Sequence, residues 1–162
     1  MSVPNLQAWG LLAAGLALSG CASLPRTAFF TDPLSPGEHV QLAGAYEANG
    51  QTALAKKQYE SALRSNKKHV PALIGLGNIA FNREDWKKAK RYYRRAVKID
   101  PGNAGAANNL AMTHLKQNKR LDEAQKLIED RLEASGELKP YLLDTLEQVI
   151  LARKNIAASQ AK

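Results

Sequence analysis

One cysteine and three histidines are the side chains with the most reactive chemistry in this chain of 162 residues. Cys21 is the only thiol, so no disulfide can form within the chain, and no Cys/His spacing matches a zinc site. We also find no Ser/His/Asp grouping and no glycine-rich phosphate loop ahead of a helix. We therefore expect that the protein is not an enzyme and holds no metal or other cofactor.

Cys21 follows an uncharged, apolar segment. Residues 1–21 contain no Lys, Arg, Asp or Glu, and residues 8–18 form an apolar run of the length of a signal-peptide core. That run is shorter than the ~20 apolar residues of a transmembrane helix. The sequence Leu18-Ser19-Gly20-Cys21 resembles the lipobox of bacterial lipoproteins, in which the cysteine is acylated and becomes the first residue after cleavage.

The lipobox resemblance implies a signal peptide over residues 1–20 and a covalent lipid, with acyl chains such as palmitate, on Cys21. Ala22 and Ser23, rather than Asp, follow the cysteine. By the same resemblance, we expect the mature protein to be lipid-anchored in the outer membrane and to face the periplasm. The alternatives are a free cysteine at the end of an apolar helix and an ordinary secretory signal cleaved elsewhere.

The segment after the cysteine lacks any periodic apolar pattern. Two prolines, Pro33 and Pro36, lie within residues 27–36, so we expect residues 21–35 to form an extended tether with a root-mean-square span of ~20 Å. Phe29 and Phe30 are unusual in a solvated tether. They are expected to pack on the folded domain or dip into the lipid interface, or alternatively to help dock a partner.

Small and bulky residues recur every 34 positions in the rest of the chain. Leu42, Leu76 and Leu110 are spaced in this way, and so are the pairs Ala55/Ala89, Tyr59/Tyr93 and Ala62/Ala96. A 34-residue period with these residue types resembles the tetratricopeptide repeat. The resemblance implies an all-α fold, namely a right-handed solenoid of three helix-turn-helix repeats over residues 36–69, 70–103 and 104–138. A capping helix over 139–157 and a flexible tail at 158–162 complete the expected organisation.

Helical periodicity in the second and last units agrees with this interpretation. The apolar residues of the second unit's second helix fall on one stripe: Trp86, Ala89, Tyr93, Ala96 and Val97. Ala124 follows Ala89 by 35 residues, which predicts one extra residue in the turn near Lys119. The expected capping helix has its own apolar face: Leu142, Leu143, Leu146, Val149 and Ile150. His39 and His114 fall at core positions of the repeat, so we expect them to take part in helix packing.

First helices of this family line an inner groove, and here they carry several amides. The residues expected to bind a protein segment in that groove are Asn78, Asn82, Asn108, Asn109 and Met112. Asparagine can both donate to and accept from a peptide backbone. Family members that clamp a C-terminal carboxylate have asparagines at the positions of Asn78 and Asn109, but also cations. Those cations are replaced here by Ile74, Tyr141 and Thr145. We therefore favour a groove for an extended or helical segment, and the alternative is that the asparagines are only solvated or capping.

Charge is distributed unevenly over a chain whose formal net charge is +8. Residues 83–98 hold eight basic side chains against two acids, whereas residues 121–137 hold six acids against two bases. The predicted basic face of the helix carries Lys87, Lys88, Arg91, Arg94 and Arg95. Such a face is either solvated or able to dock anionic material. We do not expect a nucleic acid partner, because Tyr93 occupies a core position and the chain is expected to be exported.

Together these features predict a membrane-anchored, non-enzymatic periplasmic scaffold that binds a protein segment during assembly of an envelope machine. Candidate machines are a pilus, a secretion system or a polysaccharide exporter, because the sequence resembles pilotin and assembly-factor lipoproteins of the outer membrane. The alternative function is electrostatic docking of anionic envelope polymer or lipid through the basic face.

Overall fold

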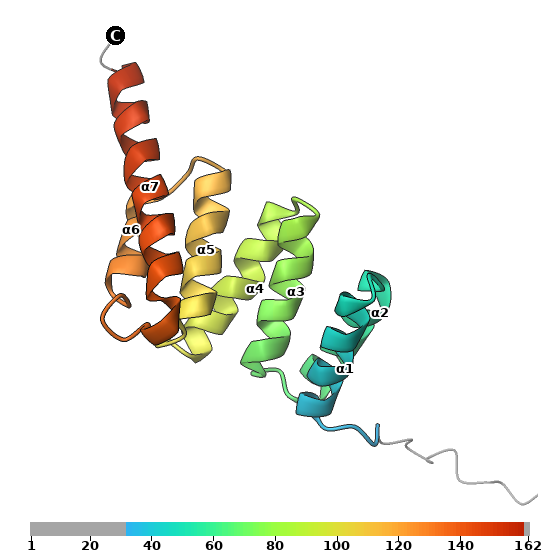
Figure 1. Cartoon of the computed structure of the whole chain (residues 1–162). Helices are drawn as coiled ribbons and strands as arrows, with labels where there is room; N and C mark the ends of the chain where they lie inside the picture. Colours follow the sequence, from blue (N-terminus) through green and yellow to red (C-terminus); the bar gives the residue numbers. More distant parts are fainter. Residues whose placement is uncertain (1–31, 161–162) are drawn as a thin grey trace, which may run out of the picture. The chain divides into compact units, whose positions relative to one another are not determined.

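The computed structural model describes residues 32–160, which form seven α-helices, one short 3₁₀ helix and no strand. Three helical hairpins and a final helix follow one another (Figure 1): α1 (Pro36–Ala48) with α2 (Thr52–Ser65), α3 (Val70–Asn82) with α4 (Trp86–Ile99), α5 (Ala104–Lys116) with α6 (Leu121–Glu129), then η1 (Gly136–Leu138) and α7 (Lys139–Gln160). Each hairpin packs against the next. The predicted all-α solenoid of three helix-turn-helix repeats with a C-terminal helix is therefore confirmed.

Each hairpin turn has a residue in the left-handed backbone conformation at the same repeat position. Gly50, Glu84 and Asn118 are 34 residues apart, and their φ angles are 71°, 57° and 51°. Residues 49–51 and 83–85 join the first two helix pairs, whereas residues 117–120 join α5 to α6. The third turn therefore has the extra residue predicted near Lys119, and it contains a second left-handed residue, Arg120, with a φ of 55°.

Polar side chains cap the beginnings of several helices. Ser35 Oγ accepts a hydrogen bond from the Glu38 backbone amide at 3.3 Å, and the Ser35 amide donates to Glu38 Oε2 at 2.7 Å. This reciprocal capping box, with Pro36 as the first helical residue, sets the start of α1. Asp85 and Asn103 accept from backbone amides of α4 and α5 in the same way. One free amide at the start of each of these three helices is thereby satisfied.

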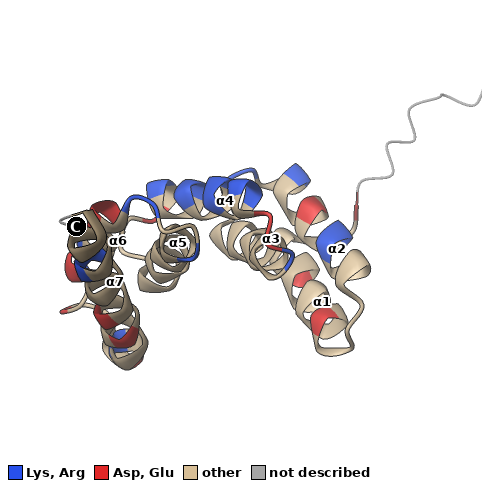
Figure 2. Ribbon diagram, turned by 90° about the horizontal axis from the view of Figure 1, so that it is seen from above, with Lys and Arg blue, Asp and Glu red and all other residues tan. Residues whose placement is uncertain are grey.

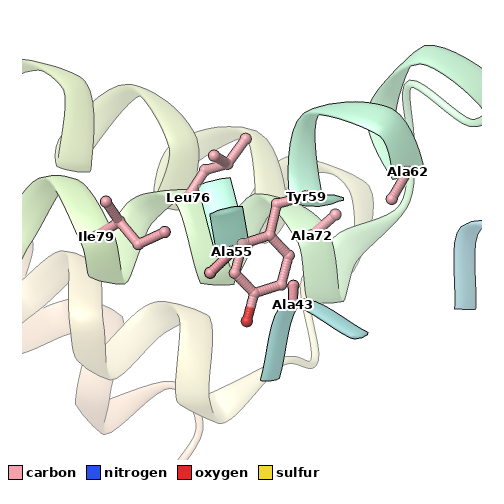
Figure 3. Packing of buried hydrophobic residues seen from close by; sticks show 7 residues of the cluster. All are labelled: Ala43, Ala55, Tyr59, Ala62, Ala72, Leu76 and Ile79. Atoms are coloured by element: carbon pink, nitrogen blue, oxygen red, sulfur yellow. The ribbon is translucent and has the colours of Figure 1, made fainter. Parts of the chain in front are cut away.

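The core is built from small residues and two tyrosines. Ala43, Ala55 and Ala62 are fully buried, and Tyr59 lies among them and residues of α3 (Figure 3). Tyr93 has the equivalent role in the second repeat and is 1% exposed. A Cβ atom on Gly77 would lie 2.4 Å from Tyr93 Cε1, so this position must be glycine for the ring to approach the backbone. The alternation of small and bulky residues thus allows close helix packing.

The final helix covers α5 and α6. Leu142 and Val149 are 1% and 0% exposed and pack in one cluster with Ala124 and Ile128. Leu143, which the sequence placed on the same apolar face, is instead 47% exposed. Leu143 lies about 100° around the helix from the buried Leu142, so its side chain falls outside the packed face.

The length of α7 also differs from the expectation. The helix ends at Gln160 rather than at residue 157, so residues 158–160 are helical where a flexible tail was predicted. Ala157 and Ala158 favour helix, and Ser159 Oγ donates to the Asn155 carbonyl oxygen at 2.9 Å. The predicted tail residues therefore extend the last turn.

The end of the predicted tether lies against α1. His39 is buried, its Nδ1 lies 2.7 Å from Gln58 Oε1, and its Nε2 lies 3.0 Å from Asp32 Oδ2. Asp32 Oδ1 also accepts from the Leu34 amide. Residues 32–35, the last residues of the predicted tether, are therefore held by the first repeat. Cys21, Phe29, Phe30 and the predicted signal peptide lie outside the described residues, and no described helix is both long and apolar enough to cross a bilayer.

Candidate functional site

A cavity of about 420 Å³ opens between the first helices of the second and third repeats and α7. Its lining contains all five residues that the sequence assigned to a peptide groove: Asn78, Asn82, Asn108, Asn109 and Met112. The other lining residues are Phe81, Tyr93, Tyr141, Asp144 and Thr145. Asn78 and Asn82 are one turn apart on α3, and Asn108 and Met112 are one turn apart on α5, so each pair projects from one helix face.

A hydrogen-bonded group of three side chains forms one wall of this cavity. Asn78 Oδ1 accepts from the Tyr93 hydroxyl at 2.8 Å and from Asn109 Nδ2 at 3.1 Å. Burial raises the pKa of Tyr93, so its hydroxyl stays protonated and remains a donor. The arrangement joins α3, α4 and α5 and holds the Asn78 amide in a single orientation.

The remaining polar groups of the lining differ in how far they are satisfied. Asn108 Oδ1 is buried and has no hydrogen-bond partner among residues 32–160. Thr145 Oγ1 donates to the Tyr141 carbonyl oxygen at 3.0 Å, and Asp144 Oδ2 accepts from Gln148 Nε2 at 2.8 Å. Asp144 is the one charged residue in the lining, which contains no Lys, Arg or His. The site is therefore amide-rich and weakly acidic.

Several lining residues were not assigned to the groove from the sequence. Tyr93 was placed in the core, and its ring is buried there, but its hydroxyl reaches the cavity. Asp144 follows Leu110 by 34 residues, so extending the repeat register into α7 points to this region of the final helix. Ile74 was expected on the inner face, yet it packs against the buried cluster of Leu73, Ala96 and Ala106 and does not line the cavity.

The predicted basic face lies along α4 (Figure 2). Its residues Lys87, Lys88, Arg91, Arg94 and Arg95 are all exposed. Arg94 Nη2 lies 3.0 Å from Glu123 Oε1 of α6, and Arg95 Nη2 donates to the Lys67 carbonyl oxygen at 3.0 Å. Both contacts join neighbouring hairpins. Lys88 pairs with Asp85, and the Arg91 guanidinium lies 5.2 Å from the centre of the Tyr92 ring. Much of the basic face therefore already has structural partners.

The two buried histidines belong to the packing of the repeats. His114 is fully buried, and its Nε2 lies 3.7 Å from Glu123 Oε1. Neither His39 nor His114 lines the cavity. Within residues 32–160, no group of three His, Cys, Asp or Glu side chains is placed to hold a metal ion.

The stacked hairpins and their amide-lined cavity define a helical-repeat scaffold. Models of the tetratricopeptide repeat match residues 40–104 and residues 80–137, which together span most of the three hairpins. The chain therefore belongs to the tetratricopeptide repeat proteins. Proteins of this family are in general non-enzymatic scaffolds that bind protein partners.

Two curated proteins are similar over a portion of the repeat region. Human "Tetratricopeptide repeat protein 6" is 33% identical over 69 residues, which are 43% of this chain and 13% of that protein. The Caenorhabditis elegans "RNA polymerase-associated protein CTR9" is 42% identical over 45 residues, which are 28% of this chain and 4% of that protein. The chain thus spans a small fraction of the length of these relatives.

Proposed function

We propose that this protein is a membrane-anchored periplasmic adaptor whose groove binds a segment of a partner protein. The observation that carries the proposal is the cavity between α3, α5 and α7, where five amide and apolar residues singled out in the sequence lie together. Asparagine amides can pair with a peptide backbone, while Phe81 and Met112 offer apolar contact. A pocket with this mixed lining is suited to a peptide segment.

The lipobox at Cys21 supports the membrane aspect of the proposal. A lipid with two or more acyl chains gives stable anchoring, whereas one chain gives reversible binding. The mature protein would then hold its repeats close to the periplasmic leaflet of the outer membrane. Its function would be to scaffold assembly of an envelope machine, such as a pilus, a secretion system or a polysaccharide exporter, as in pilotin-type lipoproteins.

Site-specific photo-crosslinking in intact cells tests the groove. A photoreactive residue at Asn82, which is exposed and lines the cavity, should give an adduct with a discrete partner protein. A matched residue at Lys98 on the exposed face of α4 should not give that adduct. The same adducts from both positions, or none from Asn82, would contradict binding through the groove.

Fractionation tests the anchor separately. The wild-type protein should sediment with membranes and resist extraction by high salt, because acyl chains bind through the hydrophobic effect. The Cys21→Ser variant should move to the soluble fraction. Firm membrane association of that variant would rule out a lipid on Cys21 as the anchor.

A second candidate function is docking of anionic lipid or polymer by the basic face. It is favoured by Lys87 and Lys98, which are exposed and make no ion pair with any residue of 32–160. Binding to phosphatidylglycerol vesicles should fall steeply with salt and be lost in a Lys87→Glu/Lys98→Glu variant. These positions are better probes than Arg94 and Arg95, whose replacement would also break contacts between hairpins.

A further inference from the structure

We propose that the groove selects a partner segment that places a Lys or Arg side chain beside Asp144 and an N–H group at Asn108 Oδ1. The segment is internal to the partner, so its terminal carboxylate does not take part in recognition. This inference rests on the proposed function and specifies the chemical class of its ligand.

The groove has already used several of its donors. The Tyr93 hydroxyl and Asn109 Nδ2 both donate to Asn78 Oδ1, and the Thr145 hydroxyl donates to a carbonyl oxygen of its own helix. The Tyr93 and Thr145 hydroxyls each carry one proton, so neither can donate to a ligand unless its internal bond is broken, whereas Asn109 Nδ2 keeps a second N–H.

Acceptors, by contrast, remain open. Asn108 Oδ1 is buried without a partner in the described residues, and a buried acceptor in that state is unfavourable until a donor reaches it. Asp144 is exposed, and within residues 32–160 its carboxylate accepts one hydrogen bond, from Gln148 on the same helix. A backbone or side-chain N–H from a bound segment would satisfy Asn108, and a cation would pair with Asp144.

The charge of the groove also favours a cationic side chain in the ligand. The cavity lining contains Asp144 and no basic residue, and α3 contains no charged residue at all. A carboxylate brought into this site would lose water and meet a like charge without a compensating cation. A Lys or Arg would instead gain an ion pair, while its methylene stem could lie on Phe81 or Met112.

Selection from a random peptide library tests the proposal. Dodecapeptides displayed on phage through their C-termini, so that they carry no free carboxylate, are selected on the full chain in mild detergent. An Asn82→Trp variant, whose side chain would fill the groove, serves as the counter-selection target. We expect the recovered peptides to be enriched in Lys and Arg and depleted in Asp and Glu.

Point variants then locate the cationic contact. A fluorescein-labelled selected peptide should bind the Asp144→Asn variant about fivefold more weakly, which is the loss expected for one partly exposed ion pair. Glu147→Gln, an exposed change on the same helix but outside the lining, should leave affinity unchanged. Asp144→Lys should reverse the preference and favour acidic peptides.

The outcomes separate this inference from the function on which it rests. Groove-dependent peptides that are acidic, that need a free C-terminal carboxylate, or that bind Asp144→Asn as well as wild type would overturn the donor-ligand proposal alone. If wild type selects no peptide over the Asn82→Trp variant, both the ligand class and the peptide-binding function are wrong. Circular dichroism of each variant confirms that it remains folded.

Discussion

The buried tyrosines show how single residues set the spacing of the repeats. The Tyr59 ring lies against Gly75 of the next hairpin, whereas the Tyr93 ring lies against Gly77 of its own hairpin. In each case a Cβ atom on the glycine would come within 2.5 Å of the ring. Tyr93 cannot easily move aside, because its ring is buried and its hydroxyl is bonded to Asn78. Glycine thus lets both rings pack in the core, and at position 77 it also accommodates the tyrosine that lines the cavity.

Gly77→Ala should therefore destabilise the fold by about 1–3 kcal/mol, the usual result of overpacking a core. Gly44→Ala is the matched control, because apart from its sequence neighbours and the backbone of its own helix, nothing lies within 4 Å of a Cβ at that position of α1. It should be neutral or stabilise the protein by up to about 1 kcal/mol, since Ala favours helix. Urea unfolding measures both values, and equal effects would contradict the packing argument.

His114 couples the stability of the third repeat to pH. Burial lowers the pKa of its imidazole below the ordinary value of 6.5, and the cations Lys90, Arg94 and Arg120 act in the same direction, while Glu123 opposes them. The unfolded chain therefore takes up a proton at a higher pH than the folded chain does. Stability is retained above about pH 6.5 and is lost as the pH falls from there towards the folded-state pKa.

The free energy of unfolding should accordingly be lower at about pH 5.5 than at about pH 7.5, a window that lies above most carboxyl titrations. A His114→Gln variant, which cannot titrate, should show a smaller difference between the two pH values. Urea denaturation of both proteins at both pH values provides the measurement. An unchanged difference in the variant would show that other groups cause the pH dependence.

Among the helices, α7 acts as the cap of the stack. It lies against α5 and α6 through Leu142, Thr145 and Val149, and it adds Asp144 to the cavity. A repeat solenoid needs such an end because each hairpin exposes an apolar face that the next element must cover. The packing residues Leu142 and Val149 and the cavity residues Tyr141 and Asp144 therefore lie on adjoining faces of this one helix, with Thr145 at the boundary between them.

Two neighbouring leucines separate the packing face of α7 from its exposed face. Leu142→Ala should destabilise the protein by about 2–5 kcal/mol, because it opens a cavity beside α6. Leu143→Ala, the same substitution one residue later at a 47% exposed position, should change stability by only about 0.5 kcal/mol. Thermal or urea unfolding distinguishes them. A similar loss for both would mean that Leu143 is covered in solution.

The repeat domain as a whole is a linear stack. Its main helix contacts join helices of the same hairpin or of adjacent ones. The stability of the stack is therefore approximately the sum of each hairpin's own stability and of the contacts between adjacent hairpins. Within residues 32–160, the second hairpin has a neighbour on both sides, whereas the first packs against one. Opening should therefore begin at the ends of the stack rather than in its middle.

Hydrogen–deuterium exchange with mass spectrometry should show this gradient. Backbone amides of α3 and α4 should exchange most slowly, those of α1 and α2 faster, and those of the last turns of α7 fastest. The last turns of α7 contain mostly exposed residues, which supports rapid exchange there. Uniform protection across the three hairpins would instead indicate a single cooperative unit.

Much of this architecture could be predicted from the sequence, because each hairpin repeats the same pattern of small and bulky residues. Leucines, alanines and tyrosines 34 residues apart mark the helices, and one displaced alanine, Ala124, reveals the longer third turn. The five groove residues could be placed for the same reason: a residue's position within a repeat decides which face of its helix it occupies. The Cys21 lipidation motif is likewise a property of sequence and stays a prediction.

Other features depend on distances between helices, which a periodic pattern does not contain. Tyr93 and Asn109 converge on one oxygen of Asn78, and Arg94 and Arg95 reach groups 29 and 28 residues away. The repeat pattern determined which residues face the groove, whereas only the tertiary packing decided which of their donors and acceptors remain free for a ligand.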